Sequence, residues 1–386
     1  MNQWIRGLLP ILLLGLLLIL FFRFGPLGVF WAAFPPVEEL TIERIVLPKP
    51  HQMIIHVTNG GPGPVTVAQV MVDQAYWQFR TERDQRTIPR LGSMKIYLPY
   101  PWVDGDAHEV TLVTSTGLTF SRTIEVATQT PGISWVFIRT FAMLGIYAGV
   151  IPVFLGLLWH PFLRELTSQW LVFFLSLTAG LLFFLAVDTF SEALETSASV
   201  PGAFQGTALI TLGLTGALLL LFYIGSSRPA GRRDSEAGRR RIAWMIALGI
   251  GLHNLGEGLA IGSAYAIGEI ALGTFLVVGF TLHNLTEGLG IVAPIAKDRP
   301  SLATLALMGL LAGGPTVVGT WIGGFSYSPA AVTLFLAIGA GAILQVLYEI
   351  GGLIAGRTES FWNGFSVGGF FSGLLIMYVT GLFVVA

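Results

Sequence analysis

The sequence predicts an all-α polytopic membrane protein: a bundle of eight helices, preceded by one N-terminal helix and carrying an inserted all-β sandwich of immunoglobulin-like type. Three observations predict this fold. Hydrophobic residues make up 53% of the 386 residues and charged residues only 11%, a balance typical of membrane proteins. Nine apolar runs approach or exceed the length of about 20 residues that crosses a bilayer. Residues 35–130 contain no such run and alternate like strands instead.

The first apolar run, residues 7–24, is expected to be a retained membrane anchor within a first domain of residues 1–34. A cleaved signal peptide is the alternative, because a charged start before a leucine-rich run fits both. The length of the run favours the anchor, and the Trp-Ala-Ala at residues 31–33 is a weak cleavage site.

Residues 35–130 form the second predicted domain, a small antiparallel β-sandwich. Turn signals such as Asn59-Gly60 and Asp104-Gly105 separate short alternating or β-branched runs. The chain has no cysteine, so packing and not disulfides must stabilise this domain. No motif identifies its ligand. The expected strands are 41–47, 52–58, 64–72, 75–79, 93–98, 108–114 and 118–126.

Residues 131–386 form the third predicted domain, with eight membrane-spanning helices. If these helices alternate sides, one set of connections carries ten Lys and Arg residues and the opposite set carries none; Arg139, near the outer end of the first bundle helix, is the one mild exception. The positive-inside rule then places the basic set in the cytoplasm. We therefore expect a multi-pass protein of the plasma (cytoplasmic, or inner) membrane, with the β-domain and the C-terminus extracytoplasmic. The basic connections are 159–168, 225–241, 297–301 and 355–360; the others are 190–201, 265–269 and 324–329.

Nearly the same ten residues occur twice inside two consecutive apolar runs. The first copy reads LHNLGEGLAI at 252–261 and the second reads LHNLTEGLGI at 282–291. Residues i and i+4 share one face of a helix, so His253 lies over Glu257 and His283 over Glu287. Ionisable side chains are costly inside a membrane unless they are paired, hydrated or bound to an ion. Two such faces turned toward each other predict a metal site.

The types of side chain indicate the metal and the class of activity. Imidazole with carboxylate suits zinc, ferrous iron or manganese, whereas a calcium site is built mostly from oxygen ligands. The intramembrane protease pattern HExxH occurs in neither copy, and no general base is evident. Transport therefore leads over hydrolysis, although a membrane-embedded metal-dependent hydrolase remains an alternative.

The pair of HNxxEG motifs on consecutive helices resembles the fourth and fifth helices of the Zrt/Irt-like (ZIP) divalent metal transporters. The resemblance covers roughly residues 134–386, including AGAILQVLYE of the seventh helix, and leaves out the leading helix and the sandwich. It implies a metal site between helices four and five. The implied principal ligands are His253, Glu257, His283 and Glu287, with Asn254 and Asn284 serving a neighbouring second position.

The chain departs from the family pattern at three positions. Family members usually have proline before the motif glutamate, where this chain has Gly256 and Thr286. The sixth helix usually offers a carboxylate, where this chain has the neutral Thr316. We therefore expect a site for a single metal ion. A homodimer is implied by the resemblance alone.

Three further acids are candidates for the path of the ion. Asp188 and Glu192 lie four residues apart at the outer end of the second helix, either as a solvated helix end or as an acidic funnel that concentrates cations. Glu349 is the only acid of the seventh helix and lies either at its cytoplasmic end or in the path.

Together these features predict a transporter that moves a divalent metal, zinc first and also iron or manganese, into the cytoplasm. We expect no enzyme activity, no prosthetic group and no nucleic-acid partner; the partners are the metal substrate and the lipid bilayer. Binding needs neutral imidazoles, so uptake is expected to fall as the pH drops through about 6.5. The alternative from another class is a membrane metal sensor whose β-domain binds a partner.

Overall fold

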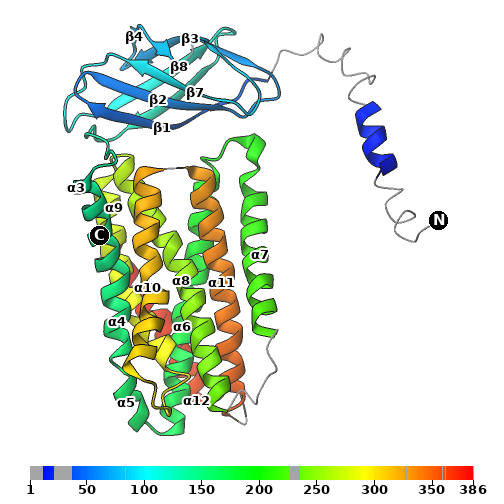
Figure 1. The fold of residues 1–386 in the computed structure, drawn as a ribbon, viewed down its shortest axis with the longest axis vertical. Coiled ribbons are helices and arrows are strands. Elements are labelled where there is room, and N and C mark those ends of the chain that lie inside the picture. The colour runs from blue at the N-terminus through cyan, green and yellow to red at the C-terminus, as the bar shows by residue number, and fades with distance from the viewer. Residues whose placement is uncertain are drawn as a thin grey trace.

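The computed structural model describes residues 12–20, 37–82, 84–226, 235–326, 328–358, 360 and 362–385. A β-sandwich lies at one end of a bundle of long helices (Figure 1). Residues 12–20 are helical, and the remainder of the predicted anchor at 1–34 lies largely outside the described residues.

The N-terminal part contains two antiparallel sheets, which confirms the predicted sandwich. One sheet has the order β1-β2-β7-β5, and the other has the order β4-β3-β8-β9 with β6 also paired to β3. The strands are β1 (Leu40–Lys49), β2 (Gln52–Asn59), β3 (Val65–Val72), β4 (Ala75–Trp77), β5 (Arg80–Thr81), β6 (Thr87–Ile88), β7 (Ser93–Leu98), β8 (His108–Thr114) and β9 (Thr119–Ile124).

Alternation along the strands explains the sandwich core. In β2 the side chains of Met53, Ile55 and Val57 are buried, whereas the residues between them are partly exposed. The same alternation in β3, β7 and β8 places valine, isoleucine and leucine side chains in one cluster between the two sheets. Burying one face of each sheet fixes the register, because a slip by one residue would turn the apolar set outward.

The strand expected at 75–79 is present but ends early, at Trp77. A turn with positive φ at Asp73 and Gln74 starts β4, which pairs with β3 as far as Trp77. The chain then changes sheets, and Arg80 pairs with Tyr97 of the other sheet. Residue alternation reports which side chains are buried but not which sheet a strand joins, so the pattern missed this crossing.

The C-terminal part is helical, and eight helical stretches of the described residues are long and apolar enough to cross a membrane. The first stretch is composite and includes a short π-helix. The elements are α3 (Trp135–Gly145), η1 (Ile146–Val150), α4 (Ile151–Leu157), α5 (His160–Glu165), α6 (Ser168–Ser197), η2 (Gly202–Phe204), α7 (Gly206–Ser226), α8 (Glu236–Ala266), α9 (Ile270–Val292), α10 (Leu302–Phe325), α11 (Pro329–Ala355) and α12 (Gly364–Val385).

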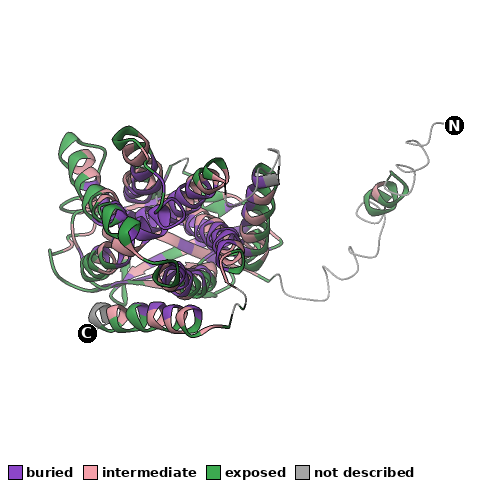
Figure 2. Ribbon diagram, turned by 90° about the horizontal axis from the view of Figure 1, so that it is seen from below, coloured by how far each residue is buried: buried purple, intermediate pink, exposed green. Residues whose placement is uncertain are grey.

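Helix α8 is the most enclosed helix of the bundle, and Figure 2 shows buried residues gathered on the inner faces of the helices. Glycines allow its close contact with α10. A Cβ atom added at Gly258 would lie 2.1 Å from the carbonyl oxygen of Thr316. Small residues commonly allow such backbone approach between membrane helices. The exposed outer faces carry large apolar side chains, as expected for contact with lipid.

The β-domain contacts the end of the bundle at which the connections lacking Lys and Arg lie. The backbone N–H of Gly202, between α6 and α7, donates to Glu39 Oε1 over 2.7 Å. Between α8 and α9, Gly268 approaches the backbone of Val126. Helix α5 and the start of α12, next to the basic connections, lie at the far end of the bundle (Figure 1).

Candidate metal centre

The two HNxxEG motifs lie on α8 and α9, which are continuous helices through the motif. Their six polar side chains are buried in an otherwise apolar bundle. Helical spacing explains the first contact, because His253 Nε2 lies 2.9 Å from Glu257 Oε1 one turn further along α8.

Glu257 joins the two helices. Its Oε1 atom lies 2.9 Å from His253 Nε2 and 2.5 Å from His283 Nε2, and its Oε2 atom accepts a hydrogen bond of 3.0 Å from Asn284 Nδ2. One ligand atom from each of His253, Glu257 and His283 lies within 4.8 Å of the other two. A single ion could therefore contact all three after small side-chain movements.

The two asparagines connect the cluster to neighbouring helices. Asn284 Nδ2 also donates to the carbonyl oxygen of Ala148 over 3.0 Å, and Asn254 Nδ2 donates to that of Ala312 over 3.1 Å. Ala148 lies in η1, the single π-helical turn between α3 and α4. Such turns occur frequently at functional sites. Sequence reasoning missed these two carbonyls, because an alanine in an apolar helix carries no signal of its backbone partner.

Glu287 lies beside the cluster rather than within it. Its Oε2 atom accepts a hydrogen bond of 3.1 Å from Asn254 Nδ2. Within the described residues, its Oε1 atom and the Oδ1 atoms of Asn254 and Asn284 are buried without a hydrogen-bond partner. Glu287 and His283 line a cavity of about 10 Å³, close to the volume of one water molecule. Buried oxygen atoms without partners are costly and are suited to accepting a cation.

The three positions that depart from the family pattern, Gly256, Thr286 and Thr316, carry uncharged residues. Thr316 is fully buried beside Gly149, and its hydroxyl has no hydrogen-bond partner among the described residues. The hydroxyl of Thr286 donates to the carbonyl of His283 over 2.6 Å, within α9. A Cβ atom added at Gly256 would lie at least 3.5 Å from its nearest neighbours, which are on α11.

The three candidate path acids lie outside the hydrogen-bonded cluster. Helix α6 continues to Ser197, so Asp188 and Glu192, which are four residues apart, share one side of it. Glu349 is buried on α11 and accepts a hydrogen bond of 3.2 Å from Gln345 Nε2. Glu349 is not among the groups that the structure brings together around Glu257.

Comparison with known proteins supports the resemblance predicted from the motifs. A family model described as "ZIP Zinc transporter" matches residues 224–350, which include both motifs. The chain is similar to the Zinc transporter ZIPB of Bordetella bronchiseptica (strain ATCC BAA-588 / NCTC 13252 / RB50), with 30% identity over 142 residues. That match covers 34% of this chain and 45% of the relative, so the chain spans less than half the length of the relative. The β-sandwich lies outside the residues that the family model matches.

Proposed function

We propose that this chain, whose residues 224–350 match the ZIP family, transports a divalent metal ion across a membrane. The substrate we propose is zinc first, with iron and manganese as further substrates. The observation that carries the proposal is the buried group of His253, Glu257 and His283, which holds two imidazoles and a carboxylate within reach of one ion. Ionisable groups in a bilayer are costly unless they are paired, hydrated or bound to an ion, and for this reason they commonly mark ion sites.

The ligand set we propose is His253, Glu257 and His283 around the ion, with Glu287 completing it. The unpartnered carboxylate oxygen of Glu287 supports its inclusion, because a small movement of that side chain would bring a second negative charge to the ion. The Oδ1 atoms of Asn254 and Asn284 have no hydrogen-bond partner among the described residues and could join the ligand set without loss of their Nδ2 hydrogen bonds.

The direction we propose is from the β-domain end of the bundle to the basic end, which is the cytoplasmic one. Asp188 and Glu192 lie toward the β-domain end of α6 and provide negative charge along the way. Glu349 lies near the basic end of α11, further along the same direction. The site is enclosed, so transport needs movement of helices that opens it to one side at a time.

The test is flux of zinc, iron or manganese into proteoliposomes that contain the purified chain. We expect saturable zinc uptake that is lost in His253→Ala and in the double variant Glu257→Gln with Glu287→Gln. The matched control is His160→Gln. His160 is also buried, and its Nε2 atom lies 3.2 Å from the carbonyl oxygen of Ile295, just beyond the end of α9 that is distant from the β-domain.

Three other outcomes would contradict the proposed transport site or favour another function. Uptake that persists in the double variant would contradict the proposed site. Tight zinc binding that requires His253 but gives no flux would favour the metal sensor. Turnover of a lipid or peptide with no flux would favour the hydrolase.

A further inference from the structure

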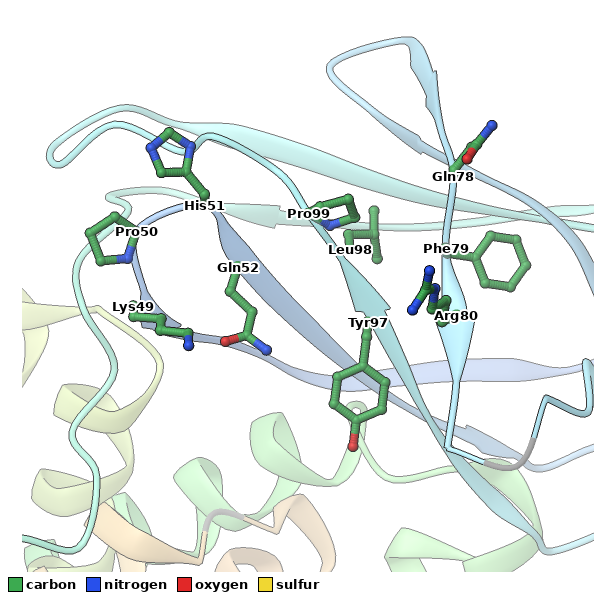
Figure 3. Close-up of a pocket in the computed structure, with 10 residues that line it drawn as sticks. All are labelled: Lys49, Pro50, His51, Gln52, Gln78, Phe79, Arg80, Tyr97, Leu98 and Pro99. Atoms are coloured by element: carbon green, nitrogen blue, oxygen red, sulfur yellow. The ribbon is translucent and has the colours of Figure 1, made fainter.

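A cavity of about 630 Å³ lies in the β-domain, away from the metal centre. It opens between the β1–β2 turn and the segment where the chain changes sheets. Figure 3 places Lys49 and Gln52 on one side of the cavity and Tyr97 and Arg80 on the other. Its volume is in the range of sites for small molecules.

Strand register explains why these side chains share one face. Lys49 of β1 pairs with Gln52 of β2, and Arg80 of β5 pairs with Tyr97 of β7. All four project from the outer face of the sheet, because the core takes the intervening side chains such as Leu98. The folding of the β-domain therefore fixes the spacing between two cations that lie 31 residues apart in the sequence.

The lining of the cavity is cationic and rich in hydrogen-bond donors. Among the described residues, no carboxylate lines the cavity, and neither Lys49 nor Arg80 forms a salt bridge. The Tyr97 hydroxyl and the Gln52 and Gln78 amides add neutral donors. Two unpaired cations beside neutral donors are suited to a phosphate oxyanion.

The neighbouring row of the same face extends the positive charge. Arg44 pairs in register with His56, and His56 pairs with Lys95. Burial, followed by the charges of Arg44 and Lys95, lowers the pKa of His56 to about 4. Two acids lie near this row: Glu82 lies 3.6 Å from Lys95, and Glu43 adjoins Arg44. The face thus has an excess of positive charge around the cavity.

We propose that this cavity binds a phosphate ester, with Lys49 and Arg80 holding the phosphate from opposite sides. Arginine binds phosphate through its planar fork and lysine acts as a point charge. The apolar rings of Phe79 and Pro99 accept the carbon part of the ester. Lys49, Gln52 and Tyr97 lie on the side of the sheet that faces the helices (Figure 3). Because this side is turned toward the membrane-spanning bundle, the ester could belong to a lipid headgroup as well as to a soluble molecule.

The experiment uses the full chain in two arms that distinguish these sources. In the first, glycerol 1-phosphate is titrated calorimetrically into detergent-solubilised protein in phosphate-free buffer. In the second, native mass spectrometry measures retention of phosphatidylglycerol relative to phosphatidylcholine after extraction from mixed nanodiscs. The variant is Lys49→Gln with Arg80→Gln, and the control is Lys95→Gln, which removes a charge from the same face outside the cavity.

We expect saturable binding in at least one arm. The double variant should weaken that binding at least tenfold and the control less than twofold. Because glycerol phosphate is also the headgroup of phosphatidylglycerol, binding of glycerol 1-phosphate identifies a soluble ester only when phosphatidylglycerol is not selectively retained. Selective retention of phosphatidylglycerol, with or without binding of glycerol 1-phosphate, identifies the lipid. The single variants Lys49→Gln and Arg80→Gln, with unchanged melting temperatures, guard against a folding defect. No binding in either arm, or equal binding by wild type and the double variant, would overturn the proposal. Neither arm depends on metal transport.

Discussion

The contact between α8 and α10 gives the sharpest test of how the metal centre is held. In Gly258→Ala, the new methyl group would lie 2.1 Å from the carbonyl oxygen of Thr316. Carbon atoms do not approach a carbonyl oxygen closer than about 3.0 Å, so the two helices must separate by about 0.9 Å. Because Gly258 follows Glu257 directly, this separation moves the carboxylate that joins His253 and His283.

The expected magnitude follows from this displacement. Overpacking of this size costs about 1–3 kcal/mol of stability. Displacing a binding group by about 1 Å can lower a rate by about a hundredfold. We therefore expect Gly258→Ala to lower the melting temperature and to reduce zinc uptake into proteoliposomes by about tenfold to a hundredfold.

Gly256→Ala is a matched control, because Gly256 lies on the other side of Glu257 in the same helix. Its new methyl group meets the nearest atom at 3.5 Å, an ordinary contact. Both variants gain about 1 kcal/mol of helix propensity, so the difference between them isolates the contact with α10. If both variants melted and transported alike, close packing of α8 on α10 would not position the site.

Three further predictions follow from the structure. The pKa of His56 is about 4 in the folded protein and about 6.5 in the unfolded chain, so stability does not change above pH 6.5 and falls as the pH is lowered toward 4. Because the ring is only partly buried, we expect a loss of about 1 kcal/mol, measured by thermal unfolding, and no such loss in His56→Gln. Asp298→Asn breaks a largely buried ion pair with Arg239 and should lower the free energy of unfolding by about 2 kcal/mol. Glu236→Gln breaks an exposed ion pair with Arg240 and should lower it by less than about 0.5 kcal/mol in the same thermal measurement. Thr316→Val keeps the shape of the side chain and removes its hydroxyl. If the site holds a single metal ion, zinc uptake into proteoliposomes should stay within about twofold of wild type. A larger loss would indicate that Thr316 contacts the ion.

The sequence was sufficient to predict the contact within α8, but not the one that closes the cluster. The i, i+4 spacing placed His253 against Glu257 because helix geometry is local. The approach of His283 to the same oxygen depends on how α8 and α9 cross. That crossing depends on glycine contacts with other helices, such as Gly288 of α9 against the carbonyl of Val153 in α4. A single sequence does not show which glycines meet.

The predicted helices of the bundle were accurate in number and less so in length. The predicted second bundle helix ended at residue 189, because Asp188, Glu192 and Glu195 interrupt the apolar run. The structure continues α6 to Ser197. Helix formation tolerates glutamate well, so the end of hydrophobicity marks the end of the apolar environment and not the end of the helix.

The asparagines show how the cluster links occupancy by an ion to the arrangement of helices. Each Nδ2 group donates to one carboxylate oxygen and one backbone carbonyl: Asn284 to Glu257 and Ala148, Asn254 to Glu287 and Ala312. An ion that draws either carboxylate toward the histidines lengthens the first of these bonds while the second holds the asparagine to another helix. Movement of α10 or of the π-turn acts on the same donors from the other side. In the proposed transport cycle, binding and helix movement therefore compete for the same hydrogen bonds, which is the coupling that an alternating-access carrier requires.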